Sequence, residues 1–160
     1  MSLRNSIVFA TVAVVLVASS LAPAQAPAEG KMEGKFVVNG IDAQLKHARG
    51  VKMPVDGKQG YAVLLSARPA TGDIAPWRTG DPVKRGSFVF VIFEGNGAIY
   101  ISELAHDKAA NTRFGVVTEV KKQAFEVRNN RLVAHIKTPS EQSFTQDKYT
   151  VDLKFDVPLE

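Results

Sequence analysis

The residues best suited to chemistry are the three histidines, because imidazole can bind metals and exchange protons near neutral pH. His47, His106 and His135 are far apart in the sequence. None lies in a His-x-His or His-Glu-x-x-His motif, which would place two ligands at one metal. His106 alone has carboxylates close by in a polar connection, namely Glu103 and Asp107. These three residues are the candidate metal site, which would need a further ligand from elsewhere; the alternative is that this connection binds no metal.

A second candidate is the long irregular stretch over residues 68–86, which contains the only tryptophan, Trp77. Arg68, Arg78 and Arg85 lie in the same stretch. An aromatic face beside guanidinium groups suits a sugar ring, an acidic ligand or a protein partner. The other interpretation is that Trp77 folds back and plugs an open end of the fold as the apolar anchor of the loop.

No arrangement of residues specifies catalysis. The serines do not follow the Gly-x-Ser-x-Gly pattern of a nucleophile elbow. Carboxylate pairs such as Glu94 with Glu103, or Asp152 with Asp156, fall on expected strands and turns, where solvated charge is the ordinary explanation. We therefore expect a protein that is not an enzyme and needs no cofactor, with a metal-dependent or hydrolytic enzyme as the alternative.

The amino-acid composition excludes cysteine chemistry and argues against one class of partner. The 160 residues include no cysteine, so disulfides, thiolate metal sites and a cysteine nucleophile are ruled out. The formal charge of +4 is spread thinly among mixed acidic and basic residues. Nucleic-acid binding requires basic residues clustered on one face, so we expect no nucleic-acid partner.

The N-terminus has the pattern of an export signal. Arg4 precedes an apolar run over residues 7–18, and small residues follow up to Ala24. The run is short for a membrane span, which takes about 20 apolar residues. We expect a signal peptide over residues 1–24, a flexible segment over residues 25–31 and one domain over residues 32–160. After removal of the signal, no integral membrane segment is expected.

The rest of the chain shows the alternation and turn signals of β-strands. Residues 88–93 are all apolar, which predicts a central strand buried on both faces, and a turn at residues 94–97 leads to its partner. Asn39-Gly40 and Asn129-Asn130 predict tight hairpins. Residues 41–48 alternate like one strand, and residues 50–60, with Pro54 and Gly57, are expected to form a loop.

About nine short strands without helical periodicity predict an all-β fold. The first choice is an antiparallel two-sheet sandwich, immunoglobulin-like or jelly-roll-like, and the alternative is a β-barrel. The long stretch over residues 68–86 favours the sandwich because it could connect the two sheets.

Three segments together resemble a recurring type of uncharacterised exported bacterial all-β domain. They are the Gly-x-Phe-x-x-Asn-Gly opening at residues 34–40, the apolar run at residues 62–66, and the Tyr-x-Val-x-Leu-x-Phe closing strand at residues 149–155. The resemblance implies a bacterial exported β-domain and carries no activity.

We therefore expect an exported, non-enzymatic binding or interaction module of the bacterial cell envelope, located in the periplasm or outside the cell. Its partner would be a protein or a small molecule. A structural component of the envelope, pairing through an open strand edge, is the remaining alternative.

Overall fold

The computed structural model describes residues 29–79, 82–110 and 113–160. The signal peptide expected over residues 1–24 lies outside this part of the chain, as does most of the segment over residues 25–31. The described residues contain eleven strands, a 3₁₀ helix η1 and a one-turn helix α1. Their bounds are β1 Lys31–Val38, β2 Ile41–Asp42, β3 His47–Val55, β4 Lys58–Ser66, η1 Ala75–Thr79, α1 Pro82–Arg85, β5 Phe88–Glu94, β6 Ile99–Ala105, β7 Arg113–Val116, β8 Lys121–Arg128, β9 Arg131–Lys137, β10 Gln142–Phe144 and β11 Asp147–Pro158.

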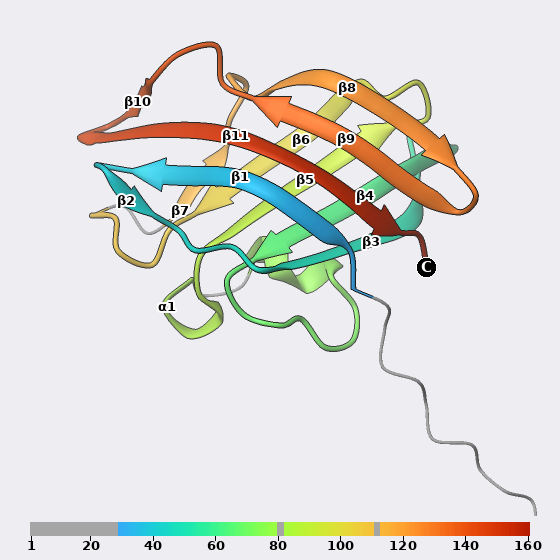
Figure 1. Ribbon diagram of the computed structural model, residues 1–160, viewed down its shortest axis with the longest axis horizontal. Coiled ribbons are helices and arrows are strands. Elements are labelled where there is room, and N and C mark those ends of the chain that lie inside the picture. The colour runs from blue at the N-terminus through green and yellow to red at the C-terminus, as the bar shows by residue number, and fades with distance from the viewer. Residues whose placement is uncertain (1–28, 80–81, 111–112) are drawn as a thin grey trace, which may run out of the picture.

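The strands form two antiparallel sheets, which confirms the predicted sandwich. The first sheet has the order β2-β1-β11-β9-β8, with β10 paired to one end of β11, and the second has the order β3-β4-β5-β6-β7. Figure 1 shows the first sheet in front of the second, with its strands crossing those behind obliquely. Neither sheet closes into a barrel.

The main hydrophobic core lies between the two sheets. Alternate residues of β11 face it, beginning with Tyr149 and Val151, while Thr150 and Asp152 lie on the other face. This confirms the alternation predicted for the closing strand. The second sheet contributes alternate residues of its central strands, with Val91 of β5 among them.

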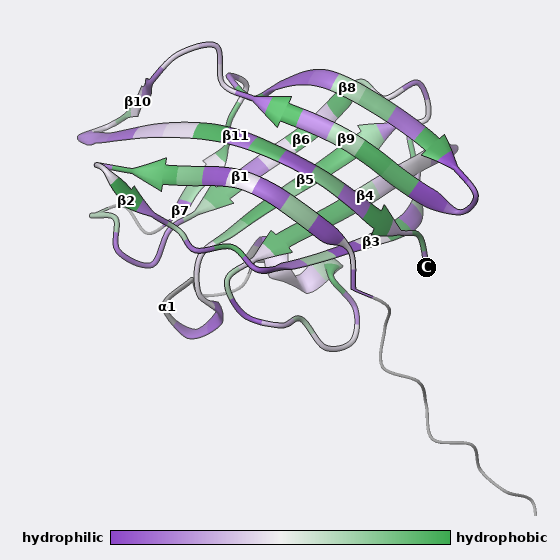
Figure 2. Cartoon of the chain, viewed as in Figure 1, coloured by the Kyte–Doolittle hydropathy of each residue, from purple (hydrophilic) through white to green (hydrophobic). Residues whose placement is uncertain are grey.

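A second apolar layer covers the opposite, outer face of the second sheet. It contains Leu64 of β4 and Phe88, Phe90 and Ile92 of β5, all at most 3 % exposed. β5 is therefore buried on both faces, as predicted. Figure 2 shows β5 as hydrophobic along its length, whereas β1 and β11 alternate between hydrophobic and hydrophilic residues.

The connection between β4 and β5, described over residues 67–79 and 82–87, covers part of this outer face, and we call it the covering loop. Because β4 and β5 are neighbours in one sheet, the expectation that this stretch crosses between the sheets is wrong. Ile74 and Trp77 of the loop pack on the outer apolar layer. The loop therefore carries its own apolar anchors, as a long connection in a β-domain requires.

Two further expectations need correction. Residues 50–60 are not a loop but part of the β3–β4 hairpin. Its turn residues Asp56 and Gly57 have φ of 49° and 74°, the left-handed values that a two-residue turn needs. Residues 41–48 are not one strand, because Gln44 has φ of 54° and its N–H donates to Asp42. This bend takes the chain from the first sheet to the second.

The two sheets are joined at one side edge and separate at the other. The end of β11 reaches β3, where the Glu160 N–H donates to the Gly50 carbonyl and the Lys52 N–H to the Glu160 carbonyl, both at 3.1 Å. At the opposite edge, within the described residues, no ladder joins β7 to β8. No helix in the described part of the chain is long and apolar enough to cross a membrane.

Candidate ligand-binding site

The candidate site is a pocket of about 480 Å³ on the outer face of the second sheet, beside the covering loop. We call it the outer pocket. Its floor is formed by apolar side chains of β3, β4 and β5, namely Val51, Met53, Ala62, Phe90 and Ile92. The covering loop contributes a side wall that includes Ile74 and Arg78, and β6 and β7 contribute Glu103 and Arg113.

The floor follows from the strand pairing. Val51 lies opposite Ala62, which lies opposite Ile92, so these side chains share one face of three adjacent strands. Ala62 and Ile92 are buried, and Val51 and Met53 are half-buried. The covering loop thus leaves part of an apolar sheet face open, which is the concave and mostly apolar surface that small ligands use.

A buried carboxylate at the end of the floor holds two arginines. Glu103 is 4 % exposed; its Oε1 accepts from Nε and Nη2 of Arg78 at 3.0 and 2.8 Å, and its Oε2 accepts from Nη2 of Arg113 at 3.3 Å. The two arginine side chains are 36 % and 38 % exposed. Glu103 therefore fixes two guanidinium groups at the boundary between the pocket and solvent.

Arginine side chains also fix the covering loop. Arg68 donates to the Lys84 carbonyl and Arg85 to the Pro76 carbonyl, both at 2.6 Å. Arg49 of β3 donates to the Ala70 and Gly72 carbonyls at 3.1 and 2.7 Å. Together with the Arg78–Glu103 pair, these bonds hold the wall of the outer pocket in place.

Trp77 of the covering loop is 7 % exposed, and its side chain packs on the outer apolar layer of the second sheet. Its ring meets Phe88 edge-on, with centroids 5.9 Å apart and an interplanar angle of 89°, and the Arg85 guanidinium lies 5.4 Å from its centroid. Of the four residues predicted to bind a ligand, Arg78 lines the outer pocket. Trp77, Arg68 and Arg85 instead hold its wall, so a direct role for them in binding stays a prediction.

The structure does not bring the three predicted metal ligands to one point. Glu103 faces the outer pocket, Asp107 accepts a 2.9 Å hydrogen bond from the Ser87 hydroxyl, and His106 is buried beside Phe36 of the first sheet. Among the described residues no group of three or more His, Cys, Asp or Glu could hold a metal ion.

His106 instead connects the two sheets. Its Nδ1 lies 3.1 Å from the Lys108 N–H, which donates to it, and its Nε2 lies 3.2 Å from the Ile41 carbonyl. This pattern fits the neutral imidazole with the proton on Nε2. Burial lowers the pKa of His106. It outweighs two opposing effects, the hydrogen bond to the Ile41 carbonyl and the attraction of the nearby carboxylates of Asp107, Asp42 and Asp147.

This lowered pKa predicts a loss of stability in acid. The unfolded chain binds a proton at His106 below about pH 6.5, the ordinary histidine value. The folded chain does so only at lower pH, so the free energy of unfolding should fall as the pH drops through that value. Urea unfolding between pH 7.5 and 5 measures the effect. His106→Asn should flatten this part of the profile, whereas His135→Asn should retain it; equal slopes in both variants would contradict the assignment.

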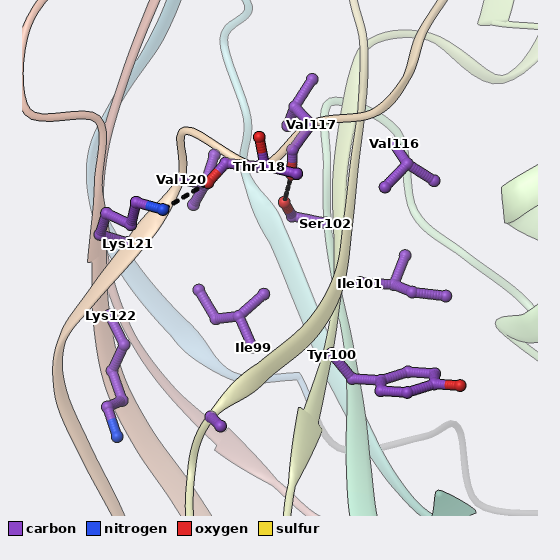
Figure 3. A pocket seen from close by; sticks show the side chains of 11 residues that line it. Ile99, Tyr100, Ile101, Ser102, Val116, Val117, Thr118, Val120, Lys121 and Lys122 are labelled. Atoms are coloured by element: carbon purple, nitrogen blue, oxygen red, sulfur yellow. Dashed lines mark hydrogen bonds between the residues drawn. The ribbon is translucent and has the colours of Figure 1, made fainter. Parts of the chain in front are cut away.

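Two other pockets have similar volumes but less suitable chemistry. One, of about 470 Å³, lies at the separate edge of the sandwich, where Ile99 and Val120 face the space between the sheets and Tyr100 points away (Figure 3). Its buried polar side chain, Ser102, already donates to the Val117 carbonyl. The other, of about 430 Å³, lies on the first sheet over Met32 and Phe155. Neither of these two pockets has a buried charged side chain beside its apolar surface, as the outer pocket has in Glu103.

Sequence reasoning missed most of the outer pocket. Arg113 has no sequence signal of a binding role, and Val51 and Met53 fall in the loop expected over residues 50–60. The available signal was Asp56-Gly57, a strong hairpin dipeptide. With that hairpin recognised, the alternation of Val51 and Met53 would have placed both residues on one apolar face.

The fold and this site define a two-sheet antiparallel β-sandwich with a ligand-sized pocket on an outer sheet face. Compared with protein-family models, curated proteins and solved structures, the chain gives no significant match.

Proposed function

We propose that the chain is an exported, non-enzymatic binding module that takes a largely apolar small molecule in the outer pocket. The observation that carries the proposal is the open apolar floor, lined by Val51 and Met53 and bordered by the buried Glu103 with its two arginines. Apolar pockets with a few convergent polar groups are the usual form of small-molecule sites. Export is supported by the signal-peptide pattern over residues 1–24 and by the resemblance to exported bacterial β-domains.

The side chains around the outer pocket support binding rather than catalysis. The buried Glu103 carboxylate is paired with Arg78 at 2.8 Å and with Arg113 at 3.3 Å. His106, the histidine with carboxylates nearby in sequence, is buried on the other side of the second sheet. The pocket offers shape, apolar surface and fixed charge. These features select a ligand without supplying a general base or a nucleophile.

A charge on the floor should abolish binding. Met53→Glu places a carboxylate in the apolar pocket, so the midpoint of thermal unfolding should no longer rise with decanol or decanoate, which are ten-carbon probes of the floor. A ligand at about a hundred times its dissociation constant adds about 2.7 kcal/mol to the free energy of unfolding, a shift of several degrees in a domain of this size.

The matched control is Val127→Glu, which adds the same charge at a 37 %-exposed valine of β8 in the other sheet. It should respond to both probes as the unmodified chain does. If neither probe stabilises the unmodified chain, or if Met53→Glu and Val127→Glu respond alike, the proposed site is wrong.

A further inference from the structure

We infer that the ligand of the outer pocket is a single-chain amphiphile with a carboxylate head, bound with its head at Arg78 and Arg113 and its chain along the floor. This inference rests on the proposed function and specifies the chemical class of the ligand.

The charges around the pocket favour an anionic head. Two guanidinium groups, those of Arg78 and Arg113, lie around the single carboxylate of Glu103 at one end of the pocket. Lys52 also lines the pocket, but its Nζ donates to Asn130 in the turn between β8 and β9, so its charge lies elsewhere. Asp73 is occupied locally, since its Oδ1 accepts the Ala75 N–H at 2.9 Å at the start of η1. At the end of the pocket where Arg78 and Arg113 share Glu103, two positive charges face one negative charge.

The arginine pair has the geometry to accept a second carboxylate. Within the described residues, Glu103 receives three N–H···O contacts from the two groups, fewer than the N–H donors that two guanidinium groups carry. Its side chain is 5 % exposed, whereas those of Arg78 and Arg113 are 36 % and 38 % exposed. One side of each arginine is therefore committed to Glu103 while much of the rest remains accessible. The planar fork of arginine matches a carboxylate, and the buried Glu103 holds both forks in position.

The floor restricts the rest of the ligand to apolar groups. Val51, Met53, Ala62, Phe90 and Ile92 have no hydrogen-bonding side chain, so a sugar or a nucleotide lying there would lose its hydrogen bonds to water. An alkyl chain makes no hydrogen bonds to water and therefore loses none when it enters the pocket. Met53, with its flexible thioether, can adapt to chains of different shape.

The apolar surface continues past the pocket along the second sheet. Ile101 of β6 is half-buried and packs on the outer layer, and Val116 of β7, opposite Glu103, is 58 % exposed. Figure 3 shows Ile101 and Val116 on the same side of their strands, away from Ile99. A chain that starts at the arginines thus has apolar surface both along the floor and toward β7.

Calorimetric titration of the full chain with three ten-carbon ligands below their micelle concentrations tests the assignment. The ligands are decanoate, decanol and decyltrimethylammonium. Decanoate should bind roughly tenfold or more tightly than decanol, the ratio that a charge-assisted hydrogen bond supports, and the cation should bind most weakly. Decyl phosphate, run in parallel, separates a carboxylate-selective site from a general anion site; tighter binding of the phosphate would overturn the carboxylate assignment.

Two variants locate the head group. Arg113→Gln and Arg78→Gln should each reduce the preference for decanoate over decanol, whereas Arg128→Gln, at a 64 %-exposed side chain of the other sheet, should leave it unchanged. Equal binding of decanoate and decanol, both lost in Met53→Glu, would overturn the anionic head while supporting the pocket. Failure of all ten-carbon ligands to bind would overturn the pocket itself.

Discussion

Trp77→Ala should lower the free energy of unfolding by about 3–5 kcal/mol, the range for removing a large buried aromatic side chain. The residue is 7 % exposed and packs edge-on against Phe88, with Arg85 stacked on its ring. Without the indole, the covering loop loses its largest apolar anchor and Arg85 loses its aromatic contact. Chemical unfolding followed by circular dichroism measures the loss, since the variant has no tryptophan.

The same variant should expose the covering loop to proteases. Residues 68–79 are held over the sheet by apolar contacts of Ile74 and Trp77, so cleavage within this range should become faster than elsewhere in the chain. Trp77→Phe, which keeps an aromatic ring over Phe88, should lose less stability and remain protected. A Trp77→Ala protein within about 1 kcal/mol of the unmodified chain, with a protected loop, would show that Trp77 is not the anchor.

Arg49→Leu should cost about 3 kcal/mol, at the lower end of the range for breaking a buried ion pair. The guanidinium donates to Glu160 at 2.6 and 3.2 Å and to the Ala70 and Gly72 carbonyls. The Arg49 side chain is 6 % exposed, while that of Glu160 is 39 % exposed. Water can therefore solvate the Glu160 carboxylate once Arg49 is removed, which limits the cost of leaving it without a partner. Removing Arg49 therefore loosens the end of the chain and the covering loop together. Urea unfolding measures the cost.

The chain provides a matched control in Arg131 and Asp156. Their atoms are also 2.6 Å apart, but the side chains are 38 % and 40 % exposed, so Arg131→Leu should cost at most about 1 kcal/mol. A double-mutant cycle of Arg49→Leu with Glu160→Gln separates the ion pair from the carbonyl bonds. Equal losses in Arg49→Leu and Arg131→Leu would contradict the role assigned to burial here.

The fold class could be predicted because its determinants are local. Alternation in residues 149–155 and continuous apolar character in residues 88–93 record one-sided and two-sided burial directly in the sequence. Asn39-Gly40 specifies its turn by positive φ, observed at 49° and 79°. One argument for the sandwich is nevertheless wrong, because the long loop after β4 returns to the same sheet and covers it.

The site could be predicted only in fragments, because it is assembled across strands. The sequence suggests Arg78 as part of a ligand site and Glu103 as part of a metal site, and no local pattern shows that residues 25 positions apart form an ion pair. Arg113 joins them only through the pairing of β6 with β7, where a register shift between Leu104 and Ala105 alters the alternation. Such pairings depend on the sheet order, which turn signals do not determine.

A two-dimensional amide NMR titration of the unmodified chain with decanoate, below its micelle concentration, locates the binding site residue by residue. We expect the chemical-shift changes to concentrate at the outer pocket, around Met53, Ile74, Arg78 and Ile92, and at Glu103. This expectation would be contradicted if the amides did not respond, or if the shifts concentrated instead at the separate edge of the sandwich, over residues 98–102 and 116–122.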